Sequence, residues 1–330
     1  YGDQMSGVLA LDTARAEEPL HTELGLSVYN TSLLNSGFTR AGTVDWLVSA
    51  RDSNLDAVLS DDLGTPDYFD VFGELGINCR EGHRLAFNIL YSDDQVVVIT
   101  ENEADELEQS VSDTLNRHFW LTLDDQWNPD LSSRTVLAYA GLENERDAEV
   151  NDPERMIASV VDRRKAEIFS LEQLWRYSGL ADHRLSWGFS LRQERARYDY
   201  RSQAIYLGLY EFYPGIESPT ENRILAEPEG SSQTLWLSDR WQLTNQTRME
   251  LGVRWDRQGY TGPEHETQFS PRISLLHAIG DRTELRLTWG RYQQSQAIHE
   301  MQVEDGIDHF FAPQRSDHYI AGIQDRKSVV

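Results

Sequence analysis

The side chains with the clearest capacity for chemistry are four oxygen donors in one short segment: Asp124, Asp125, Asn128 and Asp130. Carboxylate and amide oxygens are the ligands that Ca²⁺ prefers, so the segment is a candidate calcium site. However, the spacing of these residues does not match that of an EF-hand loop. We therefore interpret the segment as a polar turn and predict no metal site.

Catalytic motifs are absent from the sequence. It contains no GxSxG, HExxH, GxGxxG or P-loop pattern. The nine histidines are scattered, and the single cysteine, Cys79, allows neither an internal disulfide nor a cysteine metal site. We predict no catalytic residues, no cofactor and no enzymatic activity.

Two aromatic segments are the best candidates for contact with a small ligand. One reads IYLGLYEFYP and the other lies close to the end of the chain. Aromatic side chains in loops can stack on sugars, metal chelates or corrins, or they can pack the loop against itself. The candidate residues are Tyr206, Tyr210, Phe212, Tyr213, His309, Phe310 and Phe311.

The elements that must position these segments show a two-residue period. In TRMELGVRWDRQ, at 247–258, one parity carries Met249, Leu251, Val253 and Trp255, and the other carries Arg248, Glu250, Arg254 and Asp256. This alternation is typical of a β-strand with one apolar and one charged face. In a soluble sandwich the apolar face meets a core, whereas in an outer-membrane barrel it meets lipid.

The alternation recurs along the chain and predicts about 14 strands of roughly 8–14 residues. Short polar turns alternate with long irregular segments, as in an up-and-down barrel with tight turns on one rim. The short turns are at 79–83, 128–133, 179–183, 243–247 and 279–283, and the long segments are at 54–67, 94–112, 146–162, 200–231, 260–266 and 296–315.

Composition excludes several classes of protein. The net charge of −25 argues against nucleic-acid binding, which requires clustered Lys and Arg. No apolar run is long enough for a transmembrane helix, although barrel strands escape such a test. Aromatics near the predicted strand ends are typical of belts at the two membrane surfaces, or of cross-strand packing; they include Tyr91, Trp127, Tyr177, Tyr198, Trp241 and Tyr292.

Two stretches resemble the TonB-dependent outer-membrane receptors. YGDQMSGVLALDT is similar to the end of that family's plug domain, through Tyr1, Gly2, Gly7 and Val8. FSPRISLLHAIGDRTELRLTWGRYQQSQ, at 269–296, resembles the family's Ser-Pro-Arg strand, short turn and following aromatic-rich strand. The order and spacing of these motifs, rather than either one alone, carry the resemblance.

The resemblance implies an all-β fold: part of an antiparallel up-and-down transmembrane barrel, about 14 of 22 strands, preceded by the last plug strand. Residues 1–13 would end the plug, 14–19 would be a linker, and 20–324 would form the barrel. Asp325 to Val330 match the translation of a common sequencing adapter, so we expect 325–330 to be an artefact. We also expect the TonB box and most of the plug to be missing.

The function implied by the resemblance is active transport of a scarce nutrient, such as an iron chelate, cobalamin or a glycan, across the bacterial outer membrane. Its partners would be the lipid bilayer, an unknown small nutrient and the TonB–ExbB–ExbD complex. Arg248, Glu250, Arg254 and Asp256 would face the lumen. The alternatives are a passive porin, a structural or adhesion barrel, a soluble carbohydrate-binding β-sandwich and, less favoured, an outer-membrane enzyme.

Overall fold

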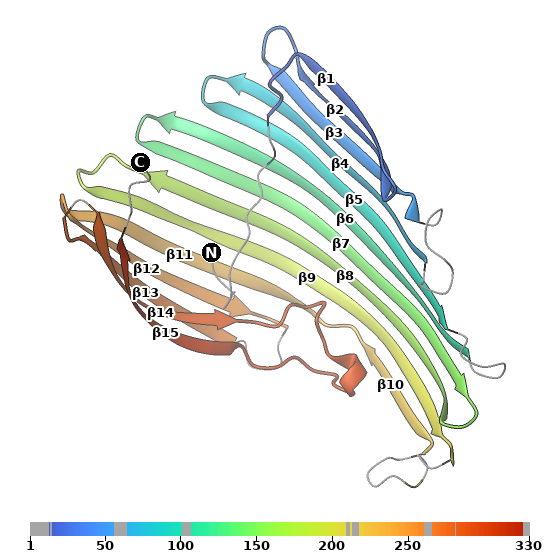
Figure 1. The fold of residues 1–330 in the computed structure, drawn as a ribbon. Helices are drawn as coiled ribbons and strands as arrows, with labels where there is room; N and C mark the ends of the chain where they lie inside the picture. The colour runs from blue at the N-terminus through green and yellow to red at the C-terminus, as the bar shows by residue number, and fades with distance from the viewer. Residues whose placement is uncertain are drawn as a thin grey trace.

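The computed structural model describes residues 13, 15–55, 65–100, 107–208, 212, 218–260, 266–280 and 282–325. In these residues the chain forms fifteen strands in one antiparallel sheet, curved like a section of a barrel wall (Figure 1). The strands are β1 (Leu20–Leu26), β2 (Asn30–Phe38), β3 (Val44–Ser53), β4 (Thr65–Arg80), β5 (His83–Thr100), β6 (Leu107–Asn128), β7 (Leu131–Asp152), β8 (Met156–Tyr177), β9 (His183–Tyr206), β10 (Thr220–Ala226), β11 (Glu229–Thr244), β12 (Thr247–Gln258), β13 (Glu266–Ala278), β14 (Thr283–Gln294) and β15 (Gln314–Asp325).

Strands that follow one another in the sequence are also neighbours in the sheet, which confirms the predicted up-and-down topology. The order runs from β1 to β9 and then from β11 to β15, and β10 also pairs with β9. β10 and β11 pair with successive parts of β9, since Ala226 faces Tyr198 and Glu229 faces Arg195. Glu227 and Pro228 interrupt an otherwise continuous strand, and Pro228 lacks the N–H that a strand would need.

The outer face of the sheet carries a continuous apolar row. Residues that pair across β4 to β9 form one line on this face: Leu75, Phe87, Leu121, Leu137, Leu171 and Leu191. These side chains do not pack against a second layer; Leu137 is 56% exposed and Phe169 is 54% exposed. The single described sheet, with its apolar face uncovered, shows that the β-sandwich alternative is wrong.

The described residues contain almost no helix; the short 3-10 helix η4 (Val303–Asp305) lies between β14 and β15. None of the helices in the described ranges is both long and apolar enough to span a bilayer. The tight turns confirm several of the short connections. Glu81 and Gly82 alone join β4 to β5, and Gly82 has φ +76°, a left-handed conformation that favours glycine.

The strands are longer than the sequence pattern predicts. β9 has 24 residues, and β6, β7 and β8 have 22 each. The prediction of a long loop at 146–162 is wrong, because only residues 153–155 separate β7 from β8. The apolar alternation on the outer face ends near Gly141; beyond it the outer face of β7 carries Glu143, Glu145, Asp147 and Glu149, whereas the inner face still includes Leu142 and Val150. Ion pairs such as Arg163 Nη2 to Asp147 Oδ2, at 2.7 Å, connect the strands there.

Other sequence predictions fall partly on residues that the structure does not describe. Tyr1, Gly2, Gly7 and Val8 lie outside the described residues, so the plug strand stays a prediction. Of the suspected artefact, only Asp325 is described, and it pairs with Thr283 at the end of β15. The predicted loop 200–231 contains β10, which accounts for the additional strand.

The uncovered apolar row predicts a face-dependent effect of charge. Leu237 lies on the outer face between Trp187 and Val253, so Leu237→Arg should lower the free energy of unfolding in a bilayer by ~2–4 kcal/mol. The next residue, Ser238, lies on the inner face between Ser186 and Gly252, and Ser238→Arg is the matched control. Urea unfolding in phosphatidylcholine vesicles measures both; equal losses for the two variants would contradict the assignment of faces.

Candidate functional site

The segment 295–313, between β14 and β15, folds onto the inner face of the sheet (Figure 1). Its apolar side chains Ile298, Met301 and Val303 are each at most 2% exposed. They pack in one buried cluster with Tyr198 and Ile224, from β9 and β10. Segment 295–313 therefore forms a layer on the inner face of the sheet, which we call the inward layer, near the rim of the longer connections.

Tyr198 is the central polar contact of this layer. Its side chain is 1% exposed, and its hydroxyl donates to the carbonyl oxygen of Ile298 at 2.7 Å. The same hydroxyl accepts a hydrogen bond from the backbone N–H of Met301 at 3.1 Å. One side chain thus satisfies two backbone groups of the segment that would otherwise be buried without partners.

An ionic contact attaches the segment further along the sheet. Glu304 accepts a hydrogen bond from Arg164 Nη2 at 2.7 Å and lies 3.4 Å from Arg146 Nη2. Arg164 also binds Asp162, which is 2% exposed. Each of these buried or half-buried charges therefore has a partner of opposite sign, as burial requires.

Tyr260, two residues after β12, contacts both ends of the segment. Tyr260 donates its hydroxyl hydrogen to the carbonyl of Gln296 at 3.0 Å, and its ring packs edge-on against Phe310. Gly306 ends η4 with φ +77°, in the left-handed region. Phe310 is therefore buried, at 8% exposure, whereas the next residue, Phe311, is 44% exposed.

The predicted ligand-contact residues thus differ in exposure: some are exposed and others are buried or half-buried. His309 and Phe311 lie together, with ring centroids 5.8 Å apart, and both are exposed. Phe310 packs inward instead. Tyr206 is half-buried at the end of β9, and Phe212 is 79% exposed. Tyr210 and Tyr213 lie outside the described residues.

The four predicted lumen residues all lie on the inner-face parity of β12. Arg254 donates to Asp256 at 2.8 Å, and Asp256 accepts from Thr234 at 2.7 Å. Glu250 lies 3.6 Å from Arg240, and Arg248 donates weakly to Gln242. Each charge thus has a partner on β12 itself or on the neighbouring β11, and the apolar residues Leu251 and Val253 are exposed on the opposite face.

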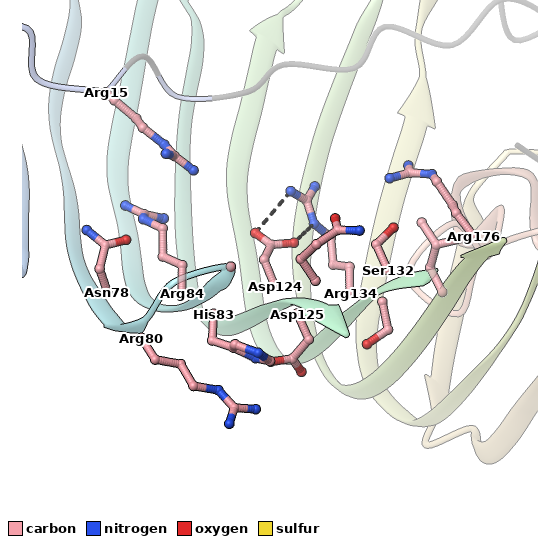
Figure 2. Close-up of a pocket in the computed structure, with 14 residues that line it drawn as sticks. Arg15, Asn78, Arg80, His83, Arg84, Asp124, Asp125, Ser132, Arg134 and Arg176 are labelled. Carbon is pink, nitrogen blue, oxygen red and sulfur yellow. Dashed lines mark hydrogen bonds and ion pairs between the residues drawn. The ribbon is translucent and has the colours of Figure 1, made fainter. Parts of the chain in front are cut away.

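A pocket of about 370 Å³ lies at the short-turn rim of the sheet, mainly on the inner face (Figure 2). Arginine dominates its lining although acids outnumber bases in the whole chain. Two of the arginines are paired: Arg84 with Asp45 and Glu74, and Arg134 with Asp124. The five lining arginines are Arg15, Arg80, Arg84, Arg134 and Arg176, against only Asp124 and Asp125.

This pocket can attract an anion. Arg15 and Arg176 form no ion pair with the described residues, and both point into the space that Figure 2 shows. Positive charge predominates in this concave surface, which raises the local concentration of anions. We did not predict this pocket from the sequence; the available signal was the recurrence of arginine within four residues of several short turns.

The oxygen donors of the candidate calcium segment do not converge on one point, because neighbouring residues of a strand face opposite sides of the sheet. Asp124 binds Arg134 on the inner face, whereas Asp125 lies on the outer face, 2.5 Å from His83 Nδ1. Asn128 Oδ1 accepts from the backbone N–H groups of Asp130 and Leu131, which closes the turn. Among the described residues, no three His, Cys, Asp or Glu side chains gather as a metal site would require.

Because Tyr198 makes two hydrogen bonds to segment 295–313, removing its hydroxyl should increase local opening of that segment. Tyr198→Phe removes both and should cost about 1–3 kcal/mol, because it leaves buried backbone groups unpaired. Hydrogen–deuterium exchange should increase at Ile298 and Met301. Tyr200→Phe is the control, since that hydroxyl has no bond to the segment in the described residues; an equal increase in both variants would contradict the anchoring role.

Comparison with known proteins places this geometry in a family. The sequence model described as TonB dependent receptor-like, beta-barrel, matches residues 27–326. No curated protein matches the chain significantly. Three similar solved structures all show the same barrel fold at low sequence identity.

The siderophore receptor PiuA from Acinetobacter baumannii is 9% identical with a TM-score of 0.67, over 89% of this chain and 52% of that one. The ferripyoverdine receptor of Pseudomonas aeruginosa is 13% identical with a TM-score of 0.66, over 94% and 46%. The ferric preacinetobactin receptor BauA from A. baumannii is 12% identical with a TM-score of 0.63, over 94% and 53%. The chain spans about half the length of these proteins.

The sequence match over nearly the whole chain, the one-sheet topology and the uncovered apolar outer face agree with one another. The chain belongs to the TonB-dependent receptors and forms part of the β-barrel by which these proteins reside in the bacterial outer membrane.

Proposed function

We propose that this chain is part of a receptor that imports a ferric chelate across the outer membrane with energy delivered by TonB, ExbB and ExbD. The observation that supports the substrate class most directly is the set of similar structures. Several of them are receptors for siderophores or ferric siderophore complexes.

The inner face supports a binding role at the rim of the longer connections. His309 and Phe311 are exposed on a segment that Tyr198, Tyr260 and Arg164 bind from the sheet and its connections. A preorganised aromatic side chain binds with a smaller loss of conformational freedom than a mobile one. We therefore propose His309 and Phe311, together with Tyr206, Tyr210, Phe212 and Tyr213, as ligand contacts, and assign Phe310 to packing.

The proposal differs from the porin and adhesion alternatives in what it requires. A passive pore needs no specific ligand, whereas a receptor binds its ligand before any energy is used. Binding measured on the chain in detergent micelles therefore tests the receptor proposal without requiring transport.

Ferric hydroxamate, ferric catecholate and ferric citrate complexes should quench the fluorescence of the nine tryptophans in a saturable manner. Cyanocobalamin and maltohexaose, titrated in the same way, should bind at least about tenfold more weakly, a difference of ~1.4 kcal/mol. Saturable binding of cobalamin or the glycan, with none of the ferric chelates, would overturn the substrate class.

Phe311→Ala should weaken binding of the preferred ferric chelate about tenfold, because an aromatic contact contributes ~0.5–1.5 kcal/mol beyond its buried area. Phe269→Ala removes an equally large ring from the outer face, where Phe269 is 55% exposed, and should leave the affinity unchanged. The affinity of both variants is measured in the same fluorescence titration. An unchanged affinity in Phe311→Ala would remove that residue from the site.

A further inference from the structure

Arginine side chains gather on the inner face of the sheet where the strands meet the short turns. In the pocket of Figure 2, Arg15 and Arg176 point into the same space as Arg134. The next strand extends this surface, because Arg176 pairs with Ser186, and Arg184 lies two residues from Ser186 on the same face. Arg240 of β11 pairs in turn with Arg184. We call this surface the arginine collar; its members are Arg15, Arg84, Arg134, Arg176, Arg184 and Arg240.

Half of the arginine collar has no carboxylate partner. Arg15, Arg176 and Arg184 form no ion pair with any residue that the structure describes, and all three are exposed. The other members each have an acidic partner, as Arg240 has in Glu250 at 3.6 Å. Unpaired cations are therefore concentrated on one concave surface of a chain whose net charge is −25.

The pairing of Arg184 with Arg240 places two like charges directly opposite each other on one face of the sheet. Like charges in this arrangement destabilise a pair of strands. An anion between the two guanidinium groups would offset the repulsion, and a planar guanidinium binds both oxygens of a carboxylate at once. The arginine collar therefore favours a ligand that carries more than one carboxylate.

The pocket within the arginine collar favours a small hydrophilic ligand over a segment of protein. Leu174 is the one aliphatic side chain among the 14 residues that line it. A protein partner buries apolar side chains at the centre of its interface, and this pocket offers almost no surface for them. Its volume of about 370 Å³ lies in the range of roughly 300–1,000 Å³ that is usual for small-molecule sites.

The position of the arginine collar is on the path of an imported solute. Short turns of outer-membrane barrels face the periplasm, and the inner face lines the lumen. A solute that leaves the lumen passes this rim, which is opposite to the rim that carries His309 and Phe311. We propose that the arginine collar is a second binding site for the imported ferric chelate, and that it selects chelates whose free carboxylates leave them with a net negative charge.

This proposal rests on the proposed import of a ferric chelate and adds the charge of that chelate. The test measures the binding of ferric citrate to the full chain in non-ionic detergent micelles, by equilibrium dialysis with radioactive iron. Arg176→Gln/Arg184→Gln should lower the affinity at least tenfold. The affinity for ferrioxamine B, a ferric hydroxamate of net positive charge, should not change. An unchanged affinity for ferric citrate in the folded double variant would overturn the proposal.

The matched control is Arg223→Gln/Arg257→Gln, which removes the same charge from the outer face. Arg223 pairs with Arg201 and Arg257 pairs with Gln233, all on the outer-face parity. Neither Arg223 nor Arg257 forms an ion pair within the described part of the chain. Circular dichroism verifies that every variant keeps its β-structure. An equal loss of affinity in the control would reveal a general effect of net charge and would contradict the arginine collar as the site.

The failure of this inference can be distinguished from the failure of the proposed function. Phe311→Ala should leave the binding of ferric citrate at the arginine collar unchanged, because the two sites lie at opposite rims. Binding that Phe311→Ala weakens, and that Arg176→Gln/Arg184→Gln does not, would leave the proposed function in place and overturn the arginine collar. If no ferric chelate binds, the proposed function itself fails.

Free anions and acidic peptides are the other ligands that a group of arginines could bind. Inorganic phosphate contacts fewer guanidinium groups at once, and hexaglutamate loses more conformational freedom on binding. At equal concentration, each should therefore displace ferric citrate less effectively than unlabelled ferric citrate does. Equally effective displacement by phosphate would indicate a site for any oxyanion, and by hexaglutamate a docking surface for an acidic protein segment; either result would overturn the proposal.

Discussion

The structure depends on one constraint: in a bilayer, every backbone N–H and C=O must find its partner within the protein. Neighbouring strands meet this requirement, and they impose a strict two-residue alternation on the side chains. The outer parity of Leu121, Leu137 and Leu171 then has to be apolar. The inner parity is free to carry the charges and tyrosines that hold segment 295–313.

Much of the fold could be predicted from the sequence because this alternation is local. The pattern of TRMELGVRWDRQ predicts the strand β12, and the spacing of the short turns gives the up-and-down order. The outer parts of β7 and β8 could not be recognised in this way. Residues such as Glu145 and Arg146 occupy opposite faces of one strand but are both charged, so no hydrophobic period is visible.

The site was less predictable because it depends on contacts between distant residues. Tyr198 is not part of an aromatic belt; it is buried on the inner face beneath residues about a hundred positions later. A signal was present in RARYDYR, where charged residues alternate with Ala196, Tyr198 and Tyr200. Likewise, only the contact with Tyr260 distinguishes Phe310, which packs inward, from its exposed neighbours His309 and Phe311.

The extra length of β7, β8 and β9 has a geometric consequence. A tilted strand crosses the hydrocarbon layer in roughly 9–11 residues, so these strands continue for about a dozen residues beyond it. At a rise of ~3.3 Å per residue and a tilt near 45°, this lifts the rim roughly 25–30 Å above the acyl chains. A rim of that height stands well clear of the lipid headgroups, so whatever contacts the ends of β7, β8 and β9 does so outside the bilayer.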